Sequence, residues 1–400
     1  MKKLITKVLL TIIMMVSILI LFNVSLSSAA KINAKIVTIE TGLNRLMQID
    51  GVKTSKGIKW KSDDSTIASI SKTGRITGKK KGITNVVATV GGKKYSCKVN
   101  VVPKMTDMQR LKKLLKDQGY AKKIDSKDKT WFKWDKKKSK LLEIGANGNF
   151  DGVQEFEFLI STPYLDLSGF KSLKKISISD CMVGELNING LKSLKDLRII
   201  SDDLKYIDFV GVKSLKNLSV GSAKLKSIPS SVLKTLKTVY ISGSVTKDIS
   251  YGSFKSAETI QLSDVKAKKI TFKNAPKLKT LKITQEGKGS LEQLNVSKLK
   301  SLKLLDCSNN KISKLTLGSL SNLITLYCDN NNLKSLNVSN LNNLCNLGCS
   351  NNKLTTLNVS SLKYLYSLGC TGNSLSELDI RGLSFIEDLW CDEGVNIIRE

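Results

Sequence analysis

Five cysteines recur at a constant interval of 21 residues in the last quarter of the chain. The frame L-x-x-L-x-C-x-x-N-x-L-x-x-L-x-V-x-x-L returns around each of them and is clearest from Leu323 to Leu341. One such unit has about seven apolar positions and cannot bury them alone, so neighbouring units must stack into a continuous core. The spacing therefore predicts a solenoid. Its cysteines are Cys307, Cys328, Cys349, Cys370 and Cys391.

The repeat frame resembles the bacterial leucine-rich repeat and is close in length to the internalin-like kind. This resemblance implies a parallel β-sheet on the concave face and an Asn side chain that bonds to backbone across coils. Superposing the second Leu of each frame gives twelve units between Phe156 and Leu389, within residues 153–400. Ten of the eleven intervals are 20 or 21 residues long.

Two features of the repeats depart from a uniform array. The interval from Leu281 to Leu305 is 24 residues, and we expect its extra residues, in 285–290, to loop out of the stack. Asn fills its position only in the late units, which predicts less regular early coils. The second half of each unit is too short for a full helix, so short strands or extended segments are expected on the convex side.

The repeat cysteines replace an inward Leu, where a thiol serves as a small apolar side chain. We therefore expect buried free thiols. Adjacent rungs of a parallel sheet lie about 4.8 Å apart, which is within the Cα range of a disulfide, so pairing between neighbours is the alternative.

Residues 1–30 have the layout of a secretory signal peptide: three lysines, an apolar run over 8–22, and small residues over 27–30. The alternative is an uncleaved anchor, but the apolar run is shorter than the roughly 20 residues that span a bilayer. We expect a secreted or cell-surface protein with no transmembrane segment after cleavage.

Residues 31–103 alternate like an all-β unit, with glycines between the short apolar runs. This segment resembles a group 2 bacterial immunoglobulin-like domain. The resemblance implies a spacer or adhesion module without catalysis, and we expect Trp60 and Cys97 in its core. It is carried by "WKSDD" at 60–64, "IASIS" at 67–71, "GRITG" at 74–78 and "KGITNVVA" at 81–88.

Residues 104–152 are predicted to link the sandwich to the solenoid and to cap the solenoid. Thr106 to Gln109 form a capping box before an amphipathic helix that ends near Gly119. Trp131, Phe132 and Trp134 follow among lysines. A nucleic-acid patch is the alternative, but the open end of a repeat array needs a closing unit. The fold class is therefore mainly β: an immunoglobulin-like sandwich, a capping helix and a leucine-rich repeat solenoid.

The net charge of +31 is concentrated in the first part of the chain. Residues 31–103 carry 15 basic and 4 acidic side chains and residues 104–140 carry 14 and 5, whereas residues 302–400 carry 8 and 9. Such a basic N-terminal segment attracts polyanions by weak, salt-sensitive contacts. An anionic cell-wall polymer is the candidate partner. The alternative is a solvated Lys-rich surface. No nucleic-acid partner is expected.

The sequence contains no histidine. This excludes serine nucleophiles with a histidine base, papain-type cysteine chemistry and zinc sites with histidine ligands. The repeat cysteines are too far apart in sequence for zinc knuckles. No enzymatic activity, cofactor or metal is expected.

A solenoid offers its sheet face for binding. Side chains alternate along a strand, so the residues on either side of the second Leu point outward and form two columns. These columns are polar and nearly neutral, and a few exposed aromatic residues suit a protein surface. We expect adhesin-like protein recognition by this face; the alternatives are a glycan-binding module and a wall-associated structural protein held by its basic N-terminal half. The candidate contact residues are Arg198, Tyr240, Gln261, Lys282, Asp306, Tyr327 and Trp390.

Overall fold

The computed structural model describes residues 30–52, 57–119, 122, 124–129, 131–145, 161–179, 181–225, 227–243, 249–251, 254–264, 266–272, 274–285, 287 and 289–399. Residues 1–29 of the predicted signal peptide and Phe156 lie outside these residues. The chain divides into two compact units, with the boundary between Met105 and Thr106.

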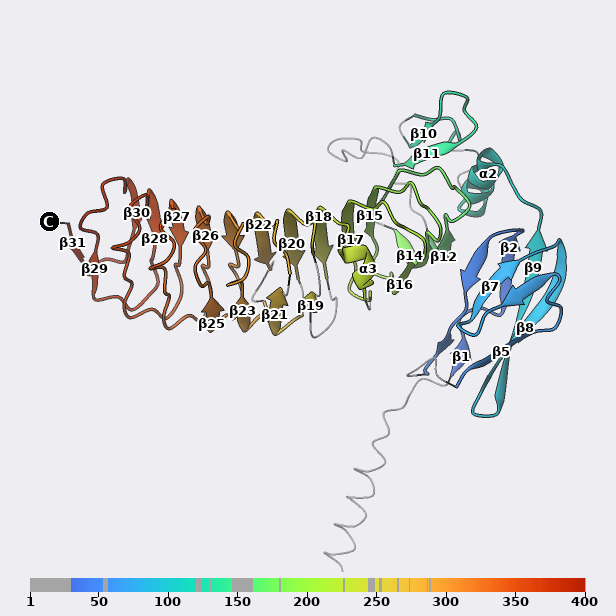
Figure 1. The fold of residues 1–400 in the computed structure, drawn as a ribbon, viewed down its shortest axis with the longest axis horizontal. Coiled ribbons are helices and arrows are strands. Elements are labelled where there is room, and N and C mark those ends of the chain that lie inside the picture. The colour runs from blue at the N-terminus through green and yellow to red at the C-terminus, as the bar shows by residue number, and fades with distance from the viewer. Residues whose placement is uncertain are drawn as a thin grey trace, which may run out of the picture. The chain divides into compact units, whose positions relative to one another are not determined.

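The first unit is a β-sandwich (Figure 1). One sheet has the order β2-β9-β8-β5, the other has the order β3-β7-β6, and β1 pairs with β4. The strands are β1 (Lys31–Ile32), β2 (Ile36–Glu40), β3 (Asn44–Leu46), β4 (Ile49–Asp50), β5 (Lys59–Ser62), β6 (Ala68–Ile70), β7 (Arg75–Gly78), β8 (Gly82–Val90) and β9 (Lys93–Val102).

Alternate residues of β8 and β9 face the sandwich core, as a half-buried strand requires. Cys97 is fully buried among them, and burial raises the pKa of its thiol to about 11. Trp60 is half-buried and packs against the same core. Gly74 allows this packing, because a Cβ at that position would lie 2.7 Å from the Met47 carbonyl oxygen and 3.0 Å from the Trp60 ring. The predicted core roles of Trp60 and Cys97 are confirmed.

The second unit is a solenoid whose main sheet has thirteen strands, in the order β10-β11-β13-β15-β17-β18-β20-β22-β24-β26-β27-β28-β30. Its first pair is antiparallel and all later pairs are parallel. The strands are β10 (Phe132–Trp134), β11 (Leu141–Ile144), β13 (Lys175–Ile178), β15 (Asp196–Ile200), β17 (Asn217–Gly221), β18 (Thr238–Ser242), β20 (Thr259–Ser263), β22 (Thr280–Thr284), β24 (Leu304–Asp306), β26 (Thr325–Tyr327), β27 (Asn346–Gly348), β28 (Ser367–Gly369) and β30 (Asp388–Trp390).

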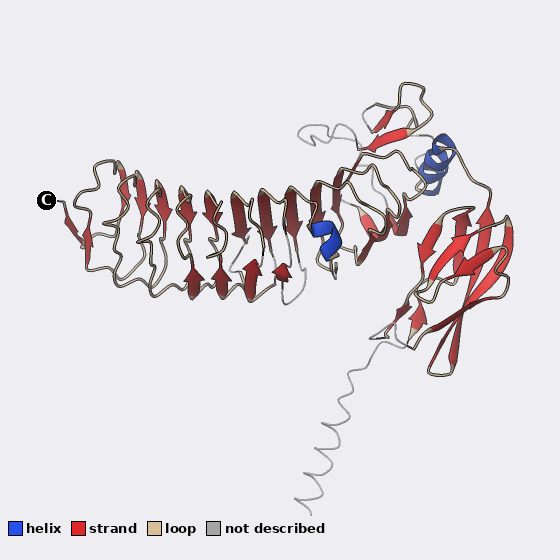
Figure 2. Cartoon of the chain, viewed as in Figure 1, coloured by secondary structure: helices blue, strands red, loops and turns tan. Residues whose placement is uncertain are grey.

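The opposite side of the coils carries short parallel strands, as predicted for the convex side (Figure 2). They form three small sheets, and a four-residue helix, α3 (Ser230–Leu233), lies between β17 and β18 in the chain. The strands are β12 (Ser161–Asp166), β14 (Met182–Asn187), β16 (Tyr206–Asp208), β19 (Ile249–Tyr251), β21 (Lys269–Phe272), β23 (Gln293–Asn295), β25 (Lys314–Thr316), β29 (Glu377–Asp379) and β31 (Asn396–Ile398). The predicted fold class, mainly β with a sandwich followed by a solenoid, is confirmed.

The helix α2 (Asp107–Asp117) precedes the solenoid and begins with the predicted capping box. Gln109 N–H donates to the Thr106 hydroxyl over 3.3 Å, and Thr106 N–H donates to the Gln109 side chain over 2.8 Å. The apolar face of α2 is buried at Leu111 and Leu115, in the same continuous core as the coils. This helix therefore covers apolar surface that the stacked coils cannot bury among themselves.

The strand beside β13 differs from the sequence prediction. The repeat count put a coil at Phe156 before the coil of Ile176, but β11 occupies the neighbouring place, with Ile144 paired to Ile176. The strand next to β13 thus comes from a hairpin of the cap and not from a repeat unit. The interval between Ile144 and Ile176 therefore does not follow the repeat period.

Buried asparagines tie the late coils together. Asn331 Nδ2 donates to the carbonyl oxygens of Cys307 and Cys328, each over 3.0 Å, and its Oδ1 accepts the Ile312 N–H over 2.9 Å. Asn352 and Asn373 repeat this pattern one and two coils later. One side chain thus satisfies buried backbone groups of two coils, as the resemblance implied.

The early coils lack these asparagines but keep the register. β15, β17, β18, β20 and β22 pair over five residues each, so the expectation of less regular early coils is wrong for these strands. Serine hydroxyls replace part of the asparagine function. The Ser201 hydroxyl donates to the Val183 carbonyl over 3.0 Å, and the Ser222 hydroxyl donates to the Leu204 carbonyl over 2.7 Å.

All eight cysteines are free thiols. Cys307, Cys328, Cys349 and Cys370 are fully buried in consecutive coils, and burial raises the pKa of each thiol, to about 12 for Cys349. A thiol with a raised pKa is little ionised near neutral pH and is a poor nucleophile. These four repeat cysteines are therefore packing residues.

We predict that Asn331→Ala lowers the free energy of unfolding by about 1–3 kcal/mol, because the buried Ile312 N–H loses its acceptor and the carbonyls of Cys307 and Cys328 each lose one of two donors. Chemical denaturation followed by circular dichroism measures this change. Asn343→Ala is the matched control, since Asn343 is exposed and donates to one carbonyl, that of Ser321, over 2.8 Å. Equal losses in the two variants would contradict the role of the buried asparagines.

We also predict that a thiol reagent modifies the half-buried Cys345 and Cys391 rapidly in the native protein, and the six buried cysteines only after unfolding. Mass spectrometry of the modified peptides identifies the sites. In the variant with Cys345→Ser and Cys391→Ser, the rapid phase should vanish. Rapid native modification of Cys328 would show that the core is open there.

Candidate ligand-binding surface

The predicted outward columns are present in the main sheet with the expected register. Strand pairing places the residues after the second Leu opposite one another from Ser177 on β13 to Trp390 on β30. This column includes all seven candidate residues. Their role as ligand contacts stays a prediction.

The seven candidates form a line. Tyr240, Gln261, Lys282, Asp306 and Tyr327 lie on five consecutive strands. Arg198 lies two strands before this run and Trp390 lies three strands after it. With about 4.8 Å between strands, the nine steps from Arg198 to Trp390 span about 43 Å. A single small ligand cannot contact all of them.

Gly348 and Gly369 follow Tyr327 in the same column, before Trp390. A Cβ on Gly348 would lie 2.5 Å from Asp329 Oδ2 and 2.9 Å from Tyr327 Cδ1, so these two side chains already lie against its backbone. Gly369 has its nearest neighbour, Ser350 Oγ, at 3.4 Å from such a Cβ. The surface is therefore open at Gly369 and covered at Gly348.

Asp329 is a partly buried carboxylate beside this column. Its Oδ1 accepts the Ser350 N–H over 2.8 Å. Burial is the main cause that raises the pKa of this carboxyl, and the nearby Asp306 adds to it. Its second oxygen lies toward Gly348 and offers an acceptor at the edge of the open strip.

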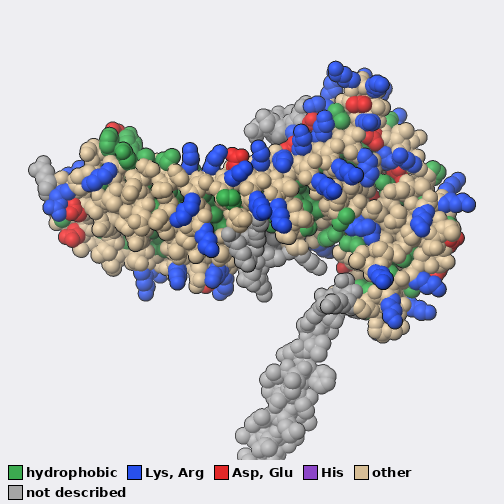
Figure 3. Space-filling view, in the orientation of Figure 1, with side chains coloured by type: hydrophobic (Ala, Val, Ile, Leu, Met, Phe, Trp, Pro, Cys, Tyr) green, Lys and Arg blue, Asp and Glu red, His purple; other side chains and the backbone are tan. Residues whose placement is uncertain are grey.

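Sequence reasoning included Trp390 but missed Tyr364, Tyr366 and Phe385, three further exposed aromatic residues on the last two coils. We call Tyr364, Tyr366, Phe385 and Trp390 the terminal aromatic patch; they are 55%, 43%, 57% and 55% exposed. Tyr364 and Phe385 stack with ring centroids 6.2 Å apart, and the Tyr366 hydroxyl donates to Glu387 over 2.6 Å. Figure 3 shows exposed hydrophobic side chains over the end of the solenoid that carries β28 and β30.

A signal in the sequence could have identified this patch. Tyr364 and Phe385 occupy the same repeat position, just before the first Leu of the frame, where the preceding two units have Asn322 and Asn343. Outward side chains were predicted only on either side of the second Leu, and this position precedes the first Leu. Because the earlier units pack with asparagine at this repeat position, packing does not require an aromatic residue there. A change from polar to aromatic at this position therefore indicates a binding surface.

The side chains of this surface are aromatic, polar or charged. Among the described residues, no group of three or more Cys, Asp or Glu side chains is placed to hold a metal ion. The exposed aromatic rings and neighbouring polar side chains can make contacts and hydrogen bonds. The arrangement suits recognition of a macromolecule.

The fold and this surface define a leucine-rich repeat solenoid that follows an immunoglobulin-like domain. Residues 29–99 match the family Bacterial Ig-like domain (group 2). The described part of the chain contains no helix with the length and hydrophobicity to cross a membrane.

A similar solved structure is described as the functional domain of InlJ from Listeria monocytogenes, which includes a cysteine ladder. It is 23% identical with a TM-score of 0.44, and the match covers 64% of this chain and 52% of that chain. This chain thus spans about half the length of that solved chain. No curated protein matches the sequence.

The two glycines of the column should respond differently to alanine. We predict that Gly369→Ala stabilises the protein by about 0.5 kcal/mol, because it restricts the unfolded chain where the folded surface has room. Gly348→Ala should destabilise it by about 1–2 kcal/mol, because Tyr327 and Asp329 must move. Thermal denaturation of the two variants tests this. Equal stability changes in both would contradict the conclusion that Tyr327 and Asp329 cover Gly348.

Proposed function

We propose that this chain is a secreted or cell-surface binding protein that recognises another protein through the main-sheet face of its solenoid. The observation that carries the proposal is the terminal aromatic patch. Its four side chains stay between 43% and 57% exposed although the coils around them bury their leucines fully. Aromatic residues of this kind supply most of the binding energy in protein interfaces.

The surroundings of the patch support protein recognition. Residues 302–400 carry 8 basic and 9 acidic side chains, so this end lacks the strong positive charge of the preceding segments. In the same column, Gly369 lies beside Trp390, and Tyr327 and the Asp329 carboxylate supply hydrogen-bonding groups near Gly348. An apolar centre with a polar border is the usual composition of a protein interface.

The immunoglobulin-like domain supports a location outside the cytoplasm. Such a unit adds length between the start of the chain and the solenoid without supplying a catalytic group. Together with the signal-peptide layout of residues 1–30, it favours an adhesin-like role in which the solenoid contacts a partner at the cell surface.

The test compares two sets of variants of the full chain for capture of surface proteins from bacterial and animal cells. Changing Tyr364, Phe385 and Trp390 to alanine should reduce capture of the specific partner at least about tenfold, because buried aromatic anchors each contribute about 2 kcal/mol or more. The control changes Met182 and Val210 to alanine; these residues are 58% and 55% exposed and lie on or next to the strands opposite the main sheet.

Unchanged capture by the aromatic variant would overturn the proposed surface. A glycan array provides the second outcome. Binding of the wild-type chain to an array glycan, with loss in the aromatic variant and no captured protein, would replace protein recognition by glycan recognition at the same patch.

A further inference from the structure

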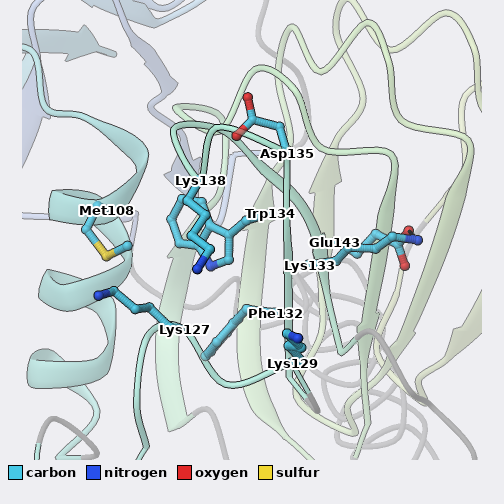
Figure 4. A pocket seen from close by; sticks show the side chains of 9 residues that line it. All are labelled: Met108, Lys127, Lys129, Phe132, Lys133, Trp134, Asp135, Lys138 and Glu143. Carbon is cyan, nitrogen blue, oxygen red and sulfur yellow. Dashed lines mark ion pairs between the residues drawn. The ribbon is translucent and has the colours of Figure 1, made fainter.

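The cap of the solenoid contains a pocket that the proposed protein recognition by the terminal aromatic patch does not use. Its volume is about 390 Å³, and it lies between α2 and the hairpin β10–β11 (Figure 4). Four lysines, three apolar residues and two acids line it: Lys127, Lys129, Lys133, Lys138, Met108, Phe132, Trp134, Asp135 and Glu143.

Two of these lysines are available to a ligand. Lys127 and Lys138 are exposed and form no ion pair among the described residues. Figure 4 shows their amino groups on one side of the pocket and the pair of Lys133 and Glu143 on the other. Lys138 has φ 51°, a backbone conformation that favours glycine or asparagine, in the turn that places it at the pocket.

The two acids do not neutralise these amino groups. Glu143 pairs with Lys133 over 2.8 Å. Asp135 accepts the backbone N–H groups of Ser139 over 2.7 Å and Lys140 over 3.0 Å, and these bonds lower the pKa of its carboxyl. Figure 4 shows the Asp135 carboxylate turned away from the amino groups of Lys127 and Lys138.

An aromatic wall completes the pocket. Phe132 is 1% exposed and forms part of the solenoid core, while Trp134 is half-buried. The Trp134 indole N–H donates to the Ser126 carbonyl over 2.9 Å, which fixes the ring. A fixed indole beside the amino groups can pack against the C–H groups of a polyol or a sugar while the lysines hold an anion.

We propose that this pocket binds a phosphodiester of a polyol or sugar, with Lys127 and Lys138 on the phosphate and Trp134 against the carbon chain. Every cation that lines the pocket is a lysine, which binds phosphate as a point charge, and no arginine offers the forked geometry that suits a carboxylate. Trp134 is the only ring of the lining that is not fully buried, whereas single-stranded nucleic acid needs a series of stacking rings.

The charge around the pocket favours a polymer over a single phosphodiester. Residues 104–140 have 14 basic and 5 acidic side chains, and Lys136 and Lys137 are exposed in the same hairpin turn as Lys138. A chain with regularly spaced phosphates can contact these lysines while one unit occupies the pocket. The inference is independent of the proposed protein recognition, because it concerns the cap.

The experiment measures binding of the full chain to poly(glycerol phosphate) by calorimetry at low and moderate salt. Lys127→Gln with Lys138→Gln should weaken binding about tenfold or more, since hydrogen bonds to charged groups are lost. The control, Lys112→Gln with Lys116→Gln, removes the same charge from exposed positions of α2 that do not line the pocket, and should weaken binding by about twofold or less. Circular dichroism checks that both variants fold.

Three further probes distinguish the outcomes. Vesicles of phosphatidylglycerol carry the same phosphodiester on a lipid surface, and binding to them alone would identify a lipid as the source of the ligand. Polyglutamate tests for unspecific charge attraction, and oligothymidylate tests for nucleic acid. Equal losses in the two double variants, or binding of either of these two polymers as tight as that of poly(glycerol phosphate), would overturn the proposal. A change of tryptophan fluorescence on binding that disappears in Trp134→Phe would support it.

Discussion

The stacking of one coil on the next is the interaction on which the rest of the solenoid depends. Each coil has too few apolar residues for a core of its own, so leucines and cysteines of neighbouring coils must be buried together. Backbone hydrogen bonds of the main sheet fix the distance between coils, and Asn331 and its equivalents satisfy buried groups that the sheet leaves unpaired. Stacking therefore sets both the stability of the core and the register of its surface.

This register explains how a repetitive core can present a non-repetitive surface. A residue at one position of the frame lies beside its equivalents in the neighbouring coils, so a change at one coil alters the surface locally without disturbing the leucines. The terminal aromatic patch arises in this way from Tyr364 and Phe385, where the preceding coils have asparagine. Gly348 shows the limit of this freedom, because Tyr327 and Asp329 occupy the space that its side chain would need.

The cap and the far end of the solenoid have different chemistry. Lysines surround the pocket between α2 and the β10–β11 hairpin, whereas exposed aromatic rings and a nearly balanced charge characterise the last coils. A salt-sensitive contact with an anion and an apolar contact with a protein follow different physics and need not compete. Two separate surfaces of one chain could thus combine retention by a polyanion with recognition of a partner.

The sequence alone determined the solenoid, the β-sandwich, the capping box and the register of the outward columns, because each depends on local chemistry or on a strict period. Tertiary structure decided what depends on which segments meet. The rung beside β13 comes from the cap hairpin, which has no repeat spacing, and Ser201 and Ser222 support coils in which the frame has lost its asparagine. The pocket around Trp134 and the stacking of Tyr364 on Phe385 were likewise decided by packing, since a period states which residues are equivalent but not which side chains touch.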